Sequence, residues 1–243
     1  MLVRSEERAP IARLLAFLEE GERMAEWCAR AQAGLAPERK GASFLIGQSR
    51  QEAMHARVFH GAILWLAPKQ RLANPWLAPM EDYRALLQDA VYRRDYLETI
   101  LAEQIILEGL GEAILSRIEA GLAKRGAPFG RLRRVLLRQE EAHHGFGLRV
   151  LDRAISEGDM SVECLRRQAE PYLGLIGPMV TTLRELFDDV HEDAAAWAAD
   201  AQAFLPSWLR DIPIPDPVAS NDLSVFSLDA APLLTPHPLH LTS

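Results

Sequence analysis

Two stretches of this sequence, Gln51-Glu52-Ala53-Met54-His55 and Glu140-Glu141-Ala142-His143-His144, each contain the pattern Glu-x-x-His. Residues three apart on an α-helix lie on one face, so the carboxylate and the imidazole can reach the same ion. A single pair is a weak signal, because acids and histidines also meet at this spacing on solvated surfaces. Two pairs, each inside a long predicted helix, indicate a metal site built between helices, and this decides the expected fold.

Apolar residues recur at spacings of three and four over most of the chain, which predicts an all-α fold. We expect bundle helices over residues 8–33, 37–66, 81–123 and 130–157, and further helices over 160–173 and 178–205. Three prolines between residues 67 and 79 exclude a helix interior there, so this stretch is a crossing connection. The sequence therefore predicts a four-helix bundle with one long crossover and additional C-terminal helices.

The composition is that of one globular domain: 243 residues, of which 49% are apolar and 25% charged. We expect a helical domain over residues 8–205, with its core bundle at about 10–157, and a Pro-rich extended tail over 206–243. The apolar runs are too short to cross a bilayer, and no secretion signal is recognised. Two cysteines make no disulfide framework, so a cytoplasmic location is expected. The net charge of −7 disfavours a nucleic-acid partner, and no membrane partner is expected.

Burial decides whether a Glu-x-x-His pair is a surface feature or a metal site. Glu52 and His55 share their helix face with Leu45 and Phe59, so they are expected to point inward. An unpaired buried carboxylate costs several kcal/mol, so a buried Glu needs a compensating cation. A pair of metal ions between the helices would supply that charge.

The second stretch offers two registers, because Glu140 with His143 and Glu141 with His144 both fit the pattern. The face of Glu141 and His144 also carries apolar side chains, at Leu137, Leu148, Leu151 and Ile155. The face of Glu140 and His143 includes Arg133 and Gly147 and is more polar. We therefore predict Glu141 and His144 as the inward pair.

A bundle site of this kind takes one more Glu from each remaining helix. Glu108 lies in phase with apolar residues of the third helix, with Glu103 as the alternative. In the first helix Glu22 replaces an apolar residue on the buried line, and Glu19 is the alternative. The separations between these acids and the motifs, 30 and 33 residues, are nearly equal, as expected of a duplicated helix pair. The predicted ligands, which would also be the catalytic residues, are Glu22, Glu52, His55, Glu108, Glu141 and His144.

This pattern resembles the di-iron carboxylate branch of the ferritin-like superfamily, over about residues 10–155. That branch includes bacterial ferritins and rubrerythrins, acyl desaturases, bacterial multicomponent monooxygenases and aldehyde-deformylating oxygenases. Both stretches resemble its Asp-Glu-x-x-His signature, with Gln51 and Glu140 at the Asp position. Ile105-Ile-Leu-Glu-Gly resembles its helix-three glutamate segment, and Leu18-Glu-Glu-Gly-Glu22 resembles the first-helix Glu-Gly-Glu of the deformylating enzymes, which favours Glu22. Phe59 stands where ribonucleotide reductase small subunits carry a radical tyrosine, which argues against that enzyme.

The resemblance implies a ferritin-like bundle that holds two Fe ions, with Mn/Fe as an alternative, and takes O₂ as co-substrate. It implies an oxidoreductase that hydroxylates, desaturates, N-oxygenates or cleaves a small organic or acyl substrate. Such an enzyme needs an external electron donor of the ferredoxin- or flavin-type reductase class, and a homodimer is compatible with it. The alternatives are a ferritin-like protein that oxidises and stores iron, and a peroxide-handling di-metal protein. His191 is interpreted as part of a solvated acidic helix face and not as a ligand.

Overall fold

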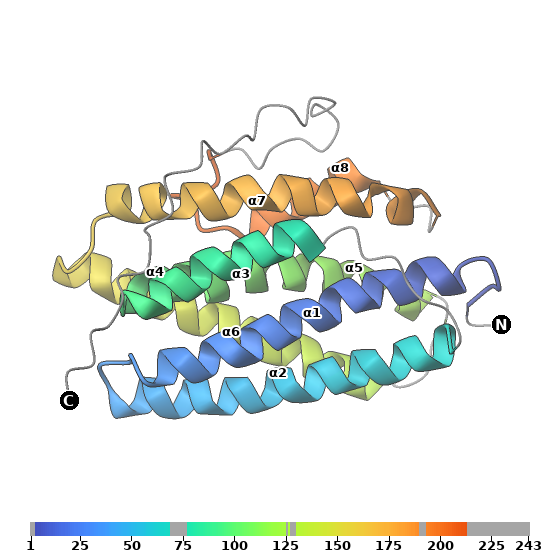
Figure 1. The fold of residues 1–243 in the computed structure, drawn as a ribbon, viewed down its shortest axis with the longest axis horizontal. Coiled ribbons are helices and arrows are strands. Elements are labelled where there is room, and N and C mark those ends of the chain that lie inside the picture. Colours follow the sequence, from blue (N-terminus) through green and yellow to red (C-terminus); the bar gives the residue numbers. More distant parts are fainter. Residues whose placement is uncertain (1–2, 69–76, 125, 127–129, 190–192, 213–243) are drawn as a thin grey trace, which may run out of the picture.

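The computed structural model of this chain describes residues 3–68, 77–124, 126, 130–189 and 193–212. All regular secondary structure within these residues is helical, which confirms the all-α prediction. The elements are α1 (Arg8–Ala33), α2 (Arg39–Leu66), α3 (Leu77–Tyr92), α4 (Tyr96–Ile100), the π-helix η1 (Leu101–Leu107), α5 (Glu108–Lys124), α6 (Gly130–Glu157), α7 (Val162–Asp189) and α8 (Ala194–Phe204) (Figure 1).

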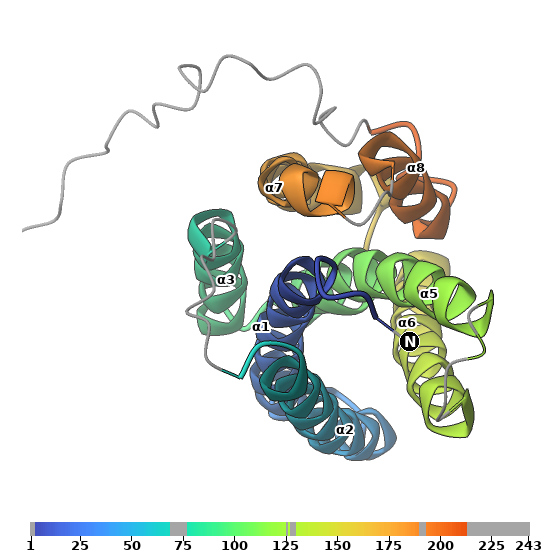
Figure 2. The same ribbon diagram turned by 90° about the vertical axis from the view of Figure 1, so that its right-hand side faces the viewer.

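Four helical segments enclose the interior that matters for function: α1, α2, the run from α4 through η1 to α5, and α6. Figure 2 shows α1 and α2 on one side of this interior and α5 and α6 on the other. The helices α7 and α8 form a further layer, in which α8 packs on α5 and α7 packs on α3. The apolar stripes of the four segments face one another, so the core lies between them.

The predicted boundaries of the first, second and fourth bundle helices agree with the structure to within two residues, as α1, α2 and α6 show. The third helix, expected over residues 81–123, is corrected in two respects: α3 begins at Leu77, within the stretch expected as a connection, with Pro79 in its first turn, and the chain breaks between α3 and α4. Arg94 adopts a left-handed conformation with φ 59°, and the side chain of Asp95 caps α4 by accepting a hydrogen bond from the Glu98 backbone N–H at 3.0 Å. Only the part after this break belongs to the bundle.

The two helices expected over residues 160–173 and 178–205 are also corrected. The helix α7 continues through Pro171 and Pro178 to Asp189, and α8 follows separately. A proline inside a helix removes one hydrogen bond and costs about 3 kcal/mol or more. Here the buried apolar face of α7, which includes Tyr172 and Ile176, packs on the core and offsets that cost.

The π-helix η1 is buried along all of its residues. At its end the backbone N–H of Glu108 donates to the carbonyl of Glu103, which is the i→i+5 bond of a π turn. Five residues apart on an α-helix would point about 140° away from each other. The wider π turn instead brings Glu103 and Glu108 toward the same face, so both acids reach the interior.

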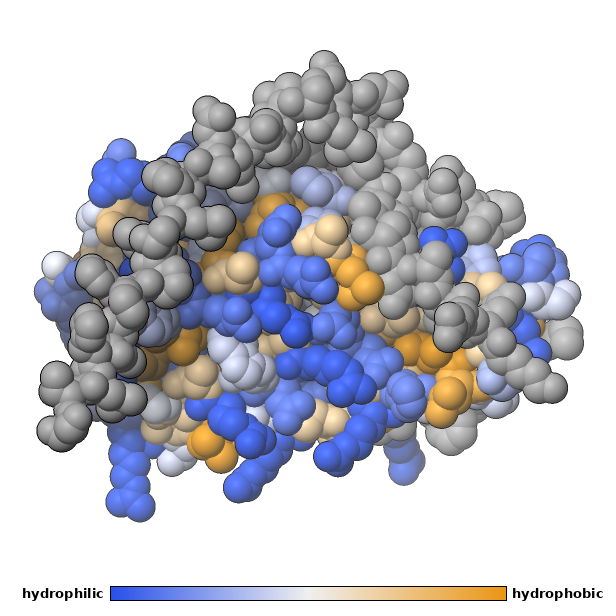
Figure 3. Space-filling model, viewed as in Figure 1, coloured by the Kyte–Doolittle hydropathy of each residue, from blue (hydrophilic) through white to orange (hydrophobic). Residues whose placement is uncertain are grey.

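The segment expected as a tail, 206–243, begins as turns over residues 206–212, and Leu209 among them is fully buried. Residues 213–243 and His191 lie outside the described residues. The face seen in Figure 3 is largely hydrophilic, with apolar side chains in separate small groups. No helix in the described part of the chain has the length and apolar character needed to span a membrane.

Candidate metal centre

Six ionisable side chains from all four segments converge in the interior. They form two overlapping groups, in each of which the ligand atoms lie within 4.8 Å of one another. The first group comprises Glu22, Glu52, His55 and Glu140, and the second comprises Glu52, Glu108, Glu140 and His143. Every one of the six is at most 9% exposed. Glu52 and Glu140 belong to both groups, so each could contribute a ligand atom to either group.

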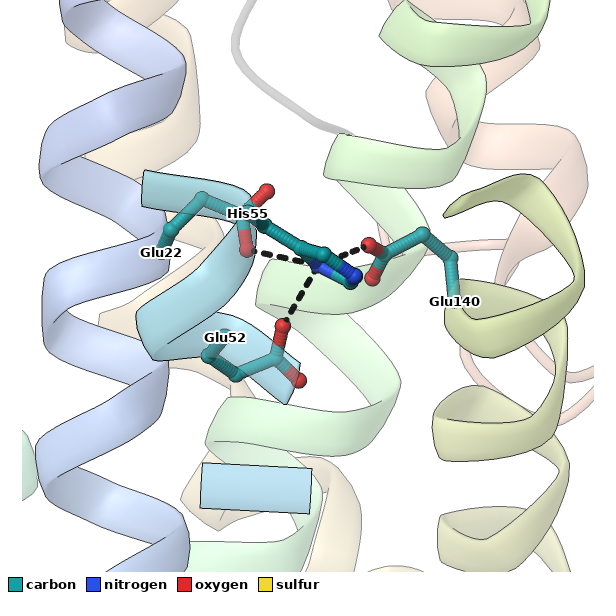
Figure 4. A group of neighbouring side chains, drawn as sticks. All are labelled: Glu22, Glu52, His55 and Glu140. Atoms are coloured by element: carbon teal, nitrogen blue, oxygen red, sulfur yellow. Dashed lines mark hydrogen bonds and ion pairs between the residues drawn. The ribbon is translucent and has the colours of Figure 1, made fainter. Parts of the chain in front are cut away.

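The first group surrounds one ring nitrogen of His55. Its Nδ1 lies 2.9 Å from Glu52 Oε2, 2.9 Å from Glu140 Oε1 and 3.3 Å from Glu22 Oε2. Figure 4 shows these three carboxylates, from α1, α2 and α6, aimed at that nitrogen. A ring nitrogen has one proton or one lone pair, so it satisfies only one of the three oxygens. The convergence therefore suits a cation placed among the four groups.

The second group is arranged in the same way around His143. Its Nδ1 lies 2.8 Å from Glu52 Oε1, 3.6 Å from Glu108 Oε1 and 3.7 Å from Glu140 Oε2. In spite of these short distances, His143 Nδ1, both oxygens of Glu52 and Glu140 Oε1 have no hydrogen-bond partner among the described residues. Buried polar atoms without partners are costly, and their gathering at one place fits lone pairs that ligate metal.

The far side of each imidazole is held by a glutamine from the other motif. Gln139 Oε1 lies 2.9 Å from His55 Nε2, and Gln51 Oε1 lies 2.7 Å from His143 Nε2. An amide oxygen only accepts, so each Nε2 carries the proton and each Nδ1 presents its lone pair to the carboxylates when the ring is neutral. Partners of this kind orient the histidine ligands of metal sites.

The buried carboxyl groups of the cluster need positive charge nearby to compensate their negative charge. Burial and the charge of Glu140 raise the pKa of Glu22 and of Glu108 well above the ordinary value. Burial alone would lower the pKa of His143, but contacts with Glu140 and Glu52 raise it to about 9. Without a metal, protons on the imidazoles and on some carboxyls supply the missing charge. With neutral imidazoles and four ionised carboxylates, two divalent cations balance the cluster.

A chain of buried amides holds Glu108 in place. Gln48 Nε2 donates to Glu108 Oε1 at 2.8 Å, and Gln104 Nε2 donates to Gln48 Oε1 at 3.3 Å. Gln104 and Gln32 exchange a further pair of hydrogen bonds of 2.7 and 2.9 Å. All three glutamines are at most 1% exposed. Glu108 Oε1, the oxygen that lies 3.6 Å from His143 Nδ1, is thus held in position by a hydrogen bond from Gln48.

Glu103, the alternative to Glu108, is fully buried beside the cluster but belongs to neither ligand group. Both of its oxygens lack a hydrogen-bond partner within the described part of the chain. Burial, followed by the charge of Glu52, raises the pKa of Glu103 to about 8, so it is mostly neutral at pH 7. Glu19, the alternative to Glu22, instead pairs with Arg23 at the surface, at 2.5 Å.

The register expected for the second motif is corrected by the structure. Glu140 and His143 lie in the cluster, whereas Glu141 is exposed and His144 contacts Glu112, with Nδ1 3.3 Å from Oε2. The structure thus brings together four of the six predicted residues, namely Glu22, Glu52, His55 and Glu108. Glu140 and His143 take the places predicted for Glu141 and His144. The line of α6 that points into the bundle is Leu136, Glu140, His143, Gly147 and Leu151.

The reason is the close approach of α6 to η1. A Cβ on Gly147 would lie 2.5 Å from Gln104 Cβ, so α6 and η1 touch along the face of α6 that carries Glu140 and His143. A sequence signal for this register exists: Gln51-Glu52-x-x-His55 and Gln139-Glu140-x-x-His143 share the longer pattern Gln-Glu-x-x-His. The glutamine directly before the glutamate, which binds the histidine of the other motif, distinguishes the register of Glu140 and His143 from that of Glu141 and His144.

A narrow pocket borders the cluster. It lies between α1 on one side and η1 and α5 on the other, and Glu22, Glu108 and Glu140 of the cluster contribute to its lining.

A comparison with known protein families and with curated proteins finds no match to this chain.

Proposed function

We propose that this protein is a di-metal oxidoreductase of the ferritin-like type, which holds two Fe ions, or Mn and Fe, and uses O₂ to oxidise a small organic molecule. The observation that carries the proposal is the pair of overlapping buried Glu/His groups that share Glu52 and Glu140. Carboxylate oxygens with imidazole nitrogens suit both Fe and Mn. When bound, the two ions would supply the redox chemistry with O₂ that no protein side chain provides.

In this proposal each side chain has a defined part. Glu22 and His55 would hold one ion, Glu108 and His143 would hold the other, and Glu52 and Glu140, which belong to both groups, would contribute to both. The glutamines behind the imidazoles keep the Nδ1 lone pairs aimed inward. The buried apolar walls around the cluster exclude water, which protects reactive chemistry from side reactions. Electrons would come from a separate reductase of the ferredoxin or flavin type.

A ferritin-like role, in which iron is oxidised and stored, is the second candidate, because the cluster alone fits it. The pocket favours the oxidation of an organic molecule. The described residues of its walls are apolar apart from the cluster carboxylates, whereas a path for hydrated iron would carry further acidic or polar side chains. Peroxide handling likewise needs no apolar pocket beside the metals.

The test combines elemental analysis with Mössbauer spectroscopy of protein expressed with iron, and two matched pairs of variants sharpen it. We expect two metal ions per chain in the wild type, in Glu141→Gln and in His144→Ala. We expect Glu140→Gln and His143→Ala to lose at least one ion. The opposite pattern, in which only the variants at 141 and 144 lose metal, would refute the site.

Assembly and oxygen use separate the two candidate functions. A monomer or dimer that keeps two ions and consumes O₂ only with a reductant supports the oxidoreductase. A large hollow oligomer that accumulates many iron ions per chain would instead establish iron storage. Both measurements use the full-length protein.

A further inference from the structure

Three glutamines, one each from α1, η1 and α2, form a chain of buried amides through the core. Gln32, Gln104 and Gln48 are all at most 1% exposed. A buried amide is costly unless its donors and its acceptor are paired. Here the amides pair with one another, and the chain ends on the carboxylate of Glu108. The chain therefore connects the interior of α1 to one group of the metal cluster.

The packing of η1 fixes the position of Gln104 in this chain. A Cβ on Gly147 would lie 2.5 Å from Gln104 Cβ, so the backbone of η1 touches α6 at this residue. The side chain of Gln104 extends to α1 and α2, where its amide bonds Gln32 and Gln48. Gln104 therefore lies where η1 meets three other helices of the bundle.

The hydrogen bonds of the chain have one direction. The amide nitrogen of Gln104 carries two hydrogens, and it donates to Gln32 Oε1 at 2.7 Å and to Gln48 Oε1 at 3.3 Å. Gln104 Oε1 accepts from Gln32 Nε2 at 2.9 Å. Because the oxygen of Gln48 faces Gln104, its nitrogen faces Glu108 and donates to Oε1 at 2.8 Å. Gln104 therefore sets the orientation of the Gln48 amide.

The orientation of Gln48 matters because an ionised carboxylate only accepts hydrogen bonds. As it stands, Gln48 donates to Glu108, and a bond to a charged acceptor is stronger than one between neutral groups. Within the described residues no other hydrogen bond fixes the Gln48 amide. Without the donor from Gln104 it can turn over and bring its own oxygen against the carboxylate. Two acceptors in contact repel, so Glu108 would move from its place beside His143.

The first group of the cluster has no counterpart of this chain. Its own carboxylate, Glu22, has Oε2 3.3 Å from His55 Nδ1, and within the described part of the chain no amide donates to it. The two groups share Glu52 and Glu140 but differ in how their remaining carboxylate is held. The two ion positions are therefore not equivalent.

Building on the proposed function, we propose that Gln104 is a positioning residue for the ion of the second group, and that it acts through the Gln48 amide. Its loss changes that ion position and leaves the position at Glu22 and His55 unchanged. Methionine is unbranched like glutamine and makes none of these hydrogen bonds, so Gln104→Met removes the amide and keeps most of the packing.

The experiment loads the full-length protein with Fe(II) in the absence of O₂ and measures Mössbauer spectra and iron affinities. For the wild type we expect two quadrupole doublets of equal area. Gln104→Met should change one doublet, leave the other unchanged, and weaken the binding of one ion about tenfold. Gln32→Met, which leaves the bond between Gln104 and Gln48 in place, should change the same doublet less.

Gln168→Met is the matched control. The Gln168 amide donates to Asp95 at 3.1 Å and to Glu98 at 3.2 Å, and neither acid belongs to the metal cluster. This variant also loses two hydrogen bonds of a glutamine, so it reports the effect of a weakened fold alone. We expect both doublets and both affinities to match those of the wild type.

A double variant shows whether Gln104 acts through Gln48. In the Gln48→Met background, adding Gln104→Met should weaken iron binding by no more than about twofold, because the amide that Gln104 orients is already gone. Circular dichroism checks that each variant is folded. If Gln104→Met does not fold, the single changed doublet expected of Gln32→Met decides the question.

The outcomes separate this role from the proposed function. Two ions in every folded variant, with both doublets as in the wild type, would overturn the role of Gln104 and leave the proposed function standing. Equal changes in both doublets, or an undiminished loss of affinity in the Gln48→Met background, would show that Gln104 acts by packing alone. A wild type that takes up no iron would overturn the proposed function and the role of Gln104 with it.

Discussion

Replacing Gly147 with alanine tests the contact on which the geometry of the cluster depends. The new Cβ would lie 2.5 Å from Gln104 Cβ and 3.1 Å from Ile105 Cδ1, whereas carbon atoms in contact are normally about 3.5–4.0 Å apart. The Ile105 methyl can move, but Gln104 Cβ is attached directly to the buried backbone of η1. Relief of the overlap therefore requires α6 and η1 to separate.

The expected magnitude follows from two opposing effects. Overpacking of a tight core contact costs about 1–3 kcal/mol, and the upper part of that range applies where backbone must move. Alanine in place of glycine in a helix returns about 1 kcal/mol. The net loss in the free energy of unfolding is thus about 2 kcal/mol. For a domain of this size that corresponds to a Tm about 4–8 °C lower.

The assay is thermal and urea denaturation of the wild type, Gly147→Ala and Gly61→Ala, followed by circular dichroism. Gly61 is an exposed glycine of α2 with open space around it, so its alanine variant should be as stable as the wild type or up to about 1 kcal/mol more stable. A Gly147→Ala variant as stable as Gly61→Ala would refute the close packing of α6 on η1, and with it the register of the motif.

Three further outcomes are expected. Gln139→Ala should weaken the binding of one metal ion about 10- to 100-fold in a metal titration, because His55 loses its partner at Nε2. Gln48→Leu should weaken binding of the other ion over a similar range, since it removes the donor that holds Glu108. Removal of metal by a chelator should lower Tm, and restored iron should raise it again, because the ions bind only the folded chain; an unchanged Tm would contradict a structural role for the cluster charge.

The spacing of apolar residues along the sequence predicts most of the helices and four of the six residues of the cluster. The buried stripes of α1 and α2 pointed to Glu22, Glu52 and His55, because a charged residue that interrupts an apolar line must face the core with the rest of that line. The same reasoning placed Glu108, although η1 was not foreseen. A π turn depends on how the segment packs against its neighbours, and no local residue pattern marks it.

The apolar spacing predicts the wrong register in α6, because a glycine is counted neither as a buried nor as an exposed residue. Gly147 looked like part of a polar line, yet it is the position of closest approach to another helix, where a side chain would not fit. Arg133, which also made that line appear polar, lies near the start of α6 and is satisfied by an ion pair with Glu119 of α5. A hydrophobicity count cannot distinguish a glycine at a tight contact from one at the surface.

Each of the two motifs supplies the glutamine that binds the histidine of the other motif. His55 lies on α2 but is held by Gln139 of α6, while His143 lies on α6 and is held by Gln51 of α2. Neither helix can complete its own half of the cluster, and both contribute a shared carboxylate, from Glu52 and Glu140. An ion bound in one group therefore restrains the ligands of the other, so the two ions should bind with positive cooperativity. Disruption of either glutamine contact should reduce that cooperativity before it abolishes binding, because the carboxylates alone still attract a cation.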